Sequence, residues 1–221
     1  MMEQKADAFI PALRFNFLTP FYDWVLRVVM REAAYKHALI QLISLEEGNK
    51  ILDAGCGTGT LTVMIKKQFP QSEVVGLDGD QEILQIANSK VFLSGDLIQL
   101  DHGFVTSMPY KNESFDACVC SLVIHHLTTD NKVKAFQEFY RILRPGGKLY
   151  IVDFFTPHNF FMMAITLITQ FFEETYDNFH GNLREYIPNA GFKELEVNQN
   201  FWTPMGTVSI ITAMKQQSYK E

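Results

Sequence analysis

The chain has 221 residues, of which 47% are hydrophobic and 20% charged, a balance that suits one folded domain with a sizeable core. Its net charge of −6 and pI near 5.5 argue against a nucleic acid partner, because binding a polyanion needs clustered Lys and Arg. The first ten residues carry Glu3 and Asp7 and lack the basic start and apolar run of a signal peptide, so we expect a cytoplasmic protein.

Two helices are expected before residue 50, because apolar residues recur at intervals of three and four over residues 17–29 and again over 34–43. The simpler interpretation is a helical flank packed on a sheet. The alternative is that three aromatic side chains of this flank cover a bound ligand: Phe17, Phe21 and Tyr22.

A buried strand runs straight into a glycine-rich turn at residues 51–60. Asp53 follows the strand, and Gly55, Gly57 and Gly59 remove side chains where the backbone must turn tightly and let a ligand approach. The helix that begins at Leu61 points its free N–H groups at the same place. Because glycines also serve plain turns, this cluster by itself leaves a ligand site and a structural turn equally open.

A second short strand at residues 72–78 ends in an acid. Asp78 follows Gly59 by nineteen positions, about the spacing at which nucleotide-binding α/β units place a carboxylate that accepts hydrogen bonds from ribose hydroxyls. The alternative role is an N-cap for the helix expected at residues 81–87. The order of strand, glycine turn, helix, strand and acid favours the nucleoside interpretation.

The elements that follow alternate between strand and helix, which is typical of a parallel sheet covered on both faces. We expect a short strand at residues 103–106, a buried strand at 114–123, a helix at 129–143, a turn at 144–147 and a strand at 148–154.

The last third begins with an unusually apolar helix, expected from Phe160 to about Glu174. It is shorter than the ~20 apolar residues that a bilayer span needs. Its wide apolar face suits buried core, a lid over a hydrophobic ligand, a peripheral membrane contact, or a homodimer interface through residues 160–172. A short helix at 183–190 and two strands at 194–198 and 208–214 complete the chain.

The three cysteines do not have the spacing of a metal site. Cys56, Cys118 and Cys120 fall in expected strand or turn positions without neighbouring histidine pairs, so we interpret them as reduced and structural and expect no metal.

Taken together, five segments of the chain resemble class I S-adenosylmethionine-dependent methyltransferases, from about residue 22 to 215. Residues 52–59 (Leu-Asp-Ala-Gly-Cys-Gly-Thr-Gly) resemble the family's first motif, and Asp78 its ribose-binding acid. The other three are residues 108–116 (Met-Pro-Tyr-Lys-Asn-Glu-Ser-Phe-Asp), 122–127 (Leu-Val-Ile-His-His-Leu) and 143–148 (Leu-Arg-Pro-Gly-Gly-Lys). The most similar subgroup is that of the ubiquinone and menaquinone biosynthesis C-methyltransferases and related small-molecule enzymes.

This resemblance implies an α/β fold with a Rossmann-like doubly wound sheet, mostly parallel with an antiparallel C-terminal strand. One domain would span 1–221, with a helical flank at 1–48, a cofactor-binding core at 49–154, a helical cap at 155–190 and C-terminal strands at 191–221. The implied cofactor is S-adenosylmethionine. The residues implied to contact it are Tyr22, Asp53, Gly55, Cys56, Gly57, Gly59, Asp78, Gly79, Phe104, Val105 and Ser121.

One position departs from the family pattern. The family usually has an acid five residues before the proline of the third segment, where the carboxylate binds the adenine amino group, and Phe104 stands there in this chain. Either Asp101 substitutes through a shift in register, or adenine is held by stacking and by the Val105 backbone.

The expected function is methyl transfer to a small lipophilic or aromatic acceptor, with a general base drawn from His125, His126 and Asp153 at the strand ends. Two alternatives remain. A nicotinamide-dependent oxidoreductase would share the turn and the acid, although Gly-x-Gly-x-Gly differs from the Gly-x-Gly-x-x-Gly of that class. A non-catalytic cofactor-binding or scaffold protein is the other, because of Phe104.

Overall fold

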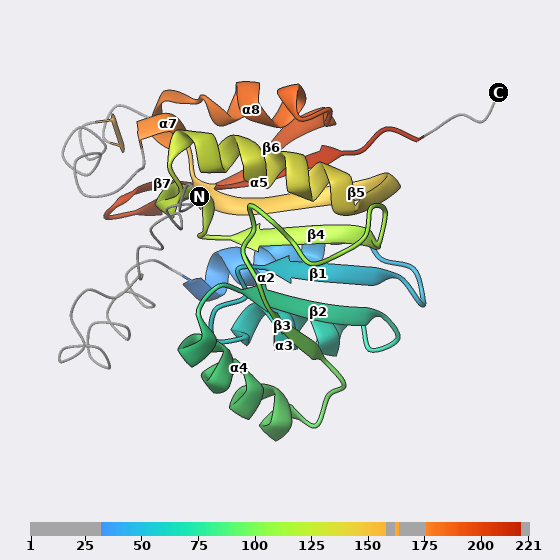
Figure 1. Cartoon of the computed structure of the whole chain (residues 1–221). Coiled ribbons are helices and arrows are strands. Elements are labelled where there is room, and N and C mark those ends of the chain that lie inside the picture. The colour runs from blue at the N-terminus through green and yellow to red at the C-terminus, as the bar shows by residue number, and fades with distance from the viewer. Residues whose placement is uncertain (1–31, 158–161, 164–175, 218–221) are drawn as a thin grey trace, which may run out of the picture.

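The computed structural model describes residues 32–157, 162–163 and 176–217, and these form one sheet with helices on both faces (Figure 1). The sheet has seven strands in the order β3-β2-β1-β4-β5-β7-β6. Their bounds are β1 Lys50–Ala54, β2 Glu73–Asp78, β3 Gln99–His102, β4 Phe115–Ser121, β5 Leu143–Phe154, β6 Lys193–Thr203 and β7 Gly206–Met214.

The strand directions confirm the expected doubly wound fold. β3, β2, β1, β4 and β5 pair in parallel, whereas β7 runs antiparallel to both β5 and β6. The chain builds outward from β1 to β3 on one side and then starts again at β4 on the other side. The carboxyl ends of β1 and β4 therefore flank the topological switch point, where sheets of this kind bind ligands.

Two hydrophobic cores hold the helices to the two faces of the sheet. On one face lie α2 (Glu32–Leu42), α3 (Thr60–Gln68) and α4 (Gln81–Ser94); on the other lie α5 (Thr129–Ile142) and α8 (Leu183–Asn189) (Figure 1). A short 3₁₀ helix, η1 (Ile124–His126), follows β4, and α7 (Tyr176–His180) packs against β5. These helices bury both faces of the central strands, whose side chains are accordingly apolar on both sides.

The third strand lies elsewhere than predicted. The strand expected at residues 103–106 is wrong: β3 is Gln99–His102, and α4 continues to Ser94 before Gly95, at φ 73°, ends it. β3 is a partly exposed edge strand with polar residues, so its own sequence lacks the alternation that marks a buried strand. It forms because its backbone pairs with β2.

Most other elements agree with expectation to within a few residues. The expected turn at 144–147 is a bulge within β5: the register with β4 moves from Phe115↔Leu143 to Ala117↔Lys148. β6 and β7 are both longer than predicted. The aromatic flank at residues 17–29 and the apolar helix expected at 160–174 lie outside the described residues, except for Met162, which is buried, and Met163, which is exposed.

Candidate cofactor and active site

The glycine turn is held against β2 by its own backbone. The N–H groups of Gly55 and Cys56 both donate to the Leu77 carbonyl, at 2.7 and 2.9 Å. Gly55, Gly57 and Gly59 all have φ between 53° and 76°, a region that side-chain-bearing residues rarely adopt. A Cβ on Gly55 would lie 2.3 Å from the Val123 side chain, whereas one on Gly57 would meet nothing within 4 Å. Gly57 therefore borders open space from which a ligand can approach.

The Asp78 carboxylate lies at the carboxyl end of β2, next to this turn. Its Oδ2 accepts the Gly57 N–H at 2.8 Å, and its Oδ1 accepts the Asp80 N–H at 2.9 Å. The N-cap of α4 is Asp80, which accepts the N–H groups of Glu82 and Ile83, so the capping role considered for Asp78 is wrong. Asp78 is only partly buried, and its carboxylate retains lone pairs that can accept the hydroxyls of a ribose.

Asp53 and Cys56 lie beneath the turn. The Asp53 carboxylate is 1% exposed and accepts the Thr62 hydroxyl at 2.6 Å, and burial raises its pKa to about 6. The Cys56 thiol is buried, and a Cβ on Gly76 would approach its sulfur to 3.0 Å; burial, then the charges of Asp53 and Asp78, raise its pKa. These two side chains support the turn from the sheet side.

Gly79, Phe104 and Val105 lie beyond Asp78, toward β3. Val105 is buried in the core, whereas Phe104 is 46% exposed and its ring lies against Gly79. Asp101, the alternative acid, lies three positions before Phe104 within β3, and its carboxylate accepts the Tyr110 hydroxyl at 2.9 Å and the Gln99 amide at 2.9 Å.

The chain leaves β4 through a strained residue. Ser121 ends β4 at the switch point, and Leu122 follows with φ 56°, although it is not a glycine. Such a conformation costs of order 1–3 kcal/mol and is kept where the surrounding structure demands it. Here the Leu122 N–H donates to Val152 at 2.7 Å, which sets the direction in which η1 leaves the sheet.

A buried histidine and aspartate meet at the end of β5. The His125 Nδ1 lies 2.8 Å from Asp153 Oδ1, and Asp153 also accepts the N–H groups of Ile124 and Phe154. Burial alone would raise the pKa of Asp153, but the charge and hydrogen bond of His125 and the Phe154 N–H lower it. Asp153 is therefore an ionised acceptor, so His125 Nδ1 carries the proton that it donates.

His126 lies beside this pair and, unlike it, reaches the surface. The His125 and His126 rings lie 3.9 Å apart between centroids. The side chain of His126 is exposed, while the protein atoms around it and the charge of His125 lower its pKa. His126 is consequently neutral at pH 7 and able to accept a proton.

Sequence reasoning missed three contributors to this region. Thr62 binds Asp53; Asn178, fully buried, donates to the Phe154 carbonyl at 3.0 Å and to Asp153 at 3.4 Å; and Lys90 donates to the hydroxyls of Thr58 and Thr60. Of these three, only Thr62 could have been predicted from the sequence, because it lies in the first turn of the helix that follows the glycines. Tyr22, the remaining predicted contact, lies outside the described residues.

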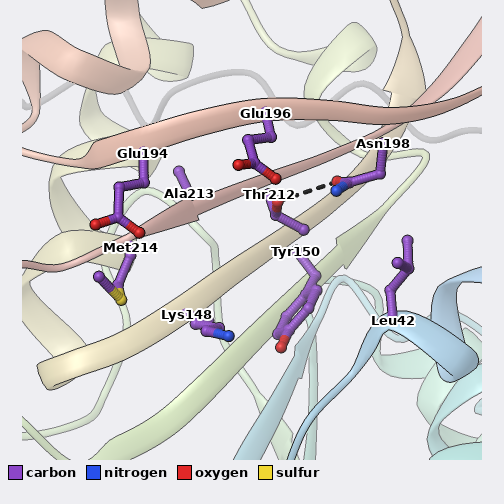
Figure 2. A pocket seen from close by; sticks show the side chains of 9 residues that line it. All are labelled: Leu42, Lys148, Tyr150, Glu194, Glu196, Asn198, Thr212, Ala213 and Met214. Atoms are coloured by element: carbon purple, nitrogen blue, oxygen red, sulfur yellow. Dashed lines mark hydrogen bonds between the residues drawn. The ribbon is translucent and has the colours of Figure 1, made fainter.

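A cavity of about 270 Å³ lies elsewhere, over strands β5, β7 and β6 beside the end of α2 (Figure 2). Figure 2 shows Glu194, Glu196 and Asn198 of β6 across from Lys148 and Tyr150 of β5. None of the predicted site residues lines it, so it is separate from the candidate site.

Within residues 32–157, 162–163 and 176–217, no helix combines the length and apolar character needed to cross a bilayer. The same ranges hold no group of three or more His, Cys, Asp or Glu side chains arranged to bind a metal ion. All three cysteines are free and buried.

Three features of the site suit three parts of S-adenosylmethionine. The open side of Gly57 leaves room for the amino acid end, Asp78 can bind the ribose, and the exposed ring of Phe104 can meet the base. Residues 51–147 match the family model described as a methyltransferase domain. Together with the fold, this match supports a class I S-adenosylmethionine-dependent methyltransferase domain over these residues.

Two relatives and one solved structure similar to this chain are named as methyltransferases. The chain is 31% identical over 147 residues to a ubiquinone/menaquinone biosynthesis C-methyltransferase of Syntrophotalea carbinolica, covering 66% of this chain and 61% of that protein. It is 25% identical over 204 residues to a demethylmenaquinone methyltransferase of Listeria welshimeri, covering 80% of this chain and 85% of the relative. A solved S-adenosylmethionine-dependent methyltransferase from Thermotoga maritima shares the fold, with a TM-score of 0.66, 22% identity, and coverage of 89% of this chain and 95% of the other.

Proposed function

We propose that this protein transfers the methyl group of S-adenosylmethionine to a small lipophilic acceptor, of which a quinol-type aromatic ring is the best candidate. The observation that carries the proposal is the Asp78 carboxylate bound to the Gly57 N–H, beside the open side of the glycine turn. The relatives support the acceptor class, because two of them are named for ubiquinone or menaquinone biosynthesis or for demethylmenaquinone.

The residues at the carboxyl edge of the sheet have different roles in binding the cofactor. The cofactor supplies a methyl group already activated on a sulfonium, so the protein chiefly positions the reactants and excludes water. Asp78 accepts the ribose hydroxyls, and the glycine turn lets the backbone come close. Val123, which follows β4, packs against Gly55, and this packing fixes the distance between the glycine turn and the end of β4.

We assign the general base to His126. When the acceptor forms its new bond to the methyl group, the methyl–sulfur bond breaks and S-adenosylhomocysteine leaves, while the acceptor loses one proton from its O–H, N–H or ring C–H. A neutral, accessible imidazole next to the switch point can take that proton. His125 is buried and bound to Asp153, so its role is to hold the His126 ring through the 3.9 Å ring contact. Asp153 in turn fixes the orientation of His125.

The experiment is a titration followed by an activity assay. The full chain is titrated calorimetrically with S-adenosylmethionine and with NADH, and is then incubated with cofactor and a demethylated naphthoquinol while S-adenosylhomocysteine is measured. We expect binding of S-adenosylmethionine and acceptor-dependent product. Binding of NADH instead would favour an oxidoreductase, and cofactor binding without methylation of any quinol, catechol or phenol tested would favour a non-catalytic binding protein.

The base assignment has its own test. His126→Gln should lower kcat by about 10²-fold or more while leaving the Kd for cofactor within about twofold. The acid limb of the wild-type pH–rate profile should lie below the ordinary imidazole pKa of about 6.5, because the pKa of His126 is lowered. An unchanged kcat would remove His126 from the chemistry.

A further inference from the structure

We propose that Phe104 is a stacking platform for the purine base of the cofactor, and that this site recognises the base by its face rather than by its 6-amino group. The inference rests on the proposed function and adds to it how the site recognises the purine base. It follows from the contact between Phe104 and Gly79.

The loop after β3 is tied to the acid that binds the ribose. Asp78 and His102 are partners in the register of β2 and β3, and the Gly103 N–H donates to the Asp78 carbonyl at 3.0 Å. His102 Nε2 also lies 3.1 Å from the Gly79 carbonyl. A nucleoside whose ribose is held at Asp78, with its other end at the glycine turn after β1, must therefore extend its base toward this loop.

The absence of a side chain at Gly79 makes room for the Phe104 ring. The φ of Gly79 lies outside the left-handed region, so the backbone alone does not demand glycine there. A Cβ at position 79 would lie 2.7 and 2.8 Å from Phe104 Cε1 and Cδ1, so a side chain there would require the ring to move. Because Gly79 has no side chain, the Phe104 ring packs against the end of β2, next to Asp78.

The Phe104 side chain remains partly exposed in this position. Phe104 is 46% exposed, and its ring meets that of His102 edge to face, with 6.0 Å between centroids. Nucleobases stack on aromatic rings that a ligand can reach, whatever the substituents on the edges of the base.

Each carboxylate of the described residues in this region has an assigned role within the protein or at the ribose. Asp101 binds Tyr110 and Gln99, Asp78 binds the Gly57 and Asp80 N–H groups, and Asp80 caps α4. A 6-amino group is a donor and a 6-oxo group an acceptor, so a site that reads this edge with a carboxylate strongly rejects the 6-oxo base. With a phenylalanine at position 104 that penalty is absent.

The test compares S-adenosylhomocysteine with its 6-oxo analogue, S-inosylhomocysteine, by calorimetry. Wild type should bind the two with Kd values within about threefold. Phe104→Ala should weaken both by about 5- to 100-fold, the loss that corresponds to one stacked base. Phe104→Asp should restore a preference of about tenfold or more for the adenosyl compound. Phe92→Ala is the matched control, because Phe92 is 85% exposed near the far end of α4.

A wild-type preference of tenfold or more for the adenosyl compound, or unchanged binding in folded Phe104→Ala, would overturn the inference and leave the proposed function standing. Failure of wild type to bind either compound at millimolar concentration would overturn both. Phe104→Leu, which keeps the bulk and loses the aromatic face, separates stacking from folding: with its circular dichroism unchanged, it should still lose most of the affinity lost by the alanine variant.

Discussion

The Asp78 carboxylate and the Gly57 N–H are joined at 2.8 Å, across twenty-one positions of the chain. This bond ties the end of β2 to the turn after β1, so that the acid and the open side of the turn hold a fixed relation before any ligand binds. Preorganisation of this kind spares the ordering cost that binding would otherwise carry.

Asp78→Ala should weaken cofactor binding by roughly 1–3 kcal/mol, because ribose hydroxyls would lose a charged acceptor. Calorimetric titration with S-adenosylhomocysteine measures the change. The control is Asp80→Ala, which removes the N-cap of α4 and should cost about 1 kcal/mol of stability with little effect on affinity. Equal affinity in wild type and Asp78→Ala would exclude the acid from the site.

Gly57 and Gly48 form a matched pair for testing where the ligand lies. Both have positive φ, 53° and 78°, and a Cβ on either meets nothing within 4 Å. Alanine at either position should cost about 1–2 kcal/mol of stability from backbone strain alone. Only Gly57→Ala should also lower cofactor affinity, by about tenfold or more, because its methyl group enters the ligand's space. Similar binding by the two variants would move the ligand away from the turn.

Asp53 should make the protein less stable as the pH rises from 4 to 6. Folding raises its pKa from 3.8 to about 6, so its contribution is complete below pH ~4 and is lost as the pH passes the folded value. The loss amounts to at most about 3 kcal/mol. The free energies of unfolding of wild type and Asp53→Asn are measured in urea at pH 4 and 7.5. Their difference isolates the contribution of Asp53, because the other titratable groups contribute equally to both proteins. Parallel pH dependences would show that the carboxylate is not desolvated.

Asp177→Ala should destabilise the protein by about 3 kcal/mol or more. The Lys132 side chain is 1% exposed and its Nζ lies 3.4 Å from Asp177 Oδ2, and the same carboxylate accepts the Thr129 and Tyr186 hydroxyls. The substitution therefore removes one ion pair and the acceptor of two further hydrogen bonds from a buried site. The matched surface pair is Lys50 and Glu73, in which the Glu73 side chain is 70% exposed; Glu73→Ala should cost less than about 1 kcal/mol. Chemical denaturation compares the two, and equal losses would contradict the burial argument.

The sequence by itself determined the order of elements and the central part of the candidate site. The strand, glycine turn, helix, strand and acid from Ile51 to Asp78 are contiguous, and each is specified by local preferences of backbone and side chain. The apolar runs that become β4 and β5 are buried on both faces, which is why they could be recognised without knowing their neighbours.

Only the tertiary structure decided which side chains meet. β3 became a strand through pairing with β2, since three of its own four residues are polar. Asp53 turned inward to Thr62, and Asp153 joined His125 and Asn178 over separations of 28 and 25 residues. Phe104 came to lie on Gly79 for the same reason: contacts between strand ends depend on register and direction across the sheet, which no local pattern encodes.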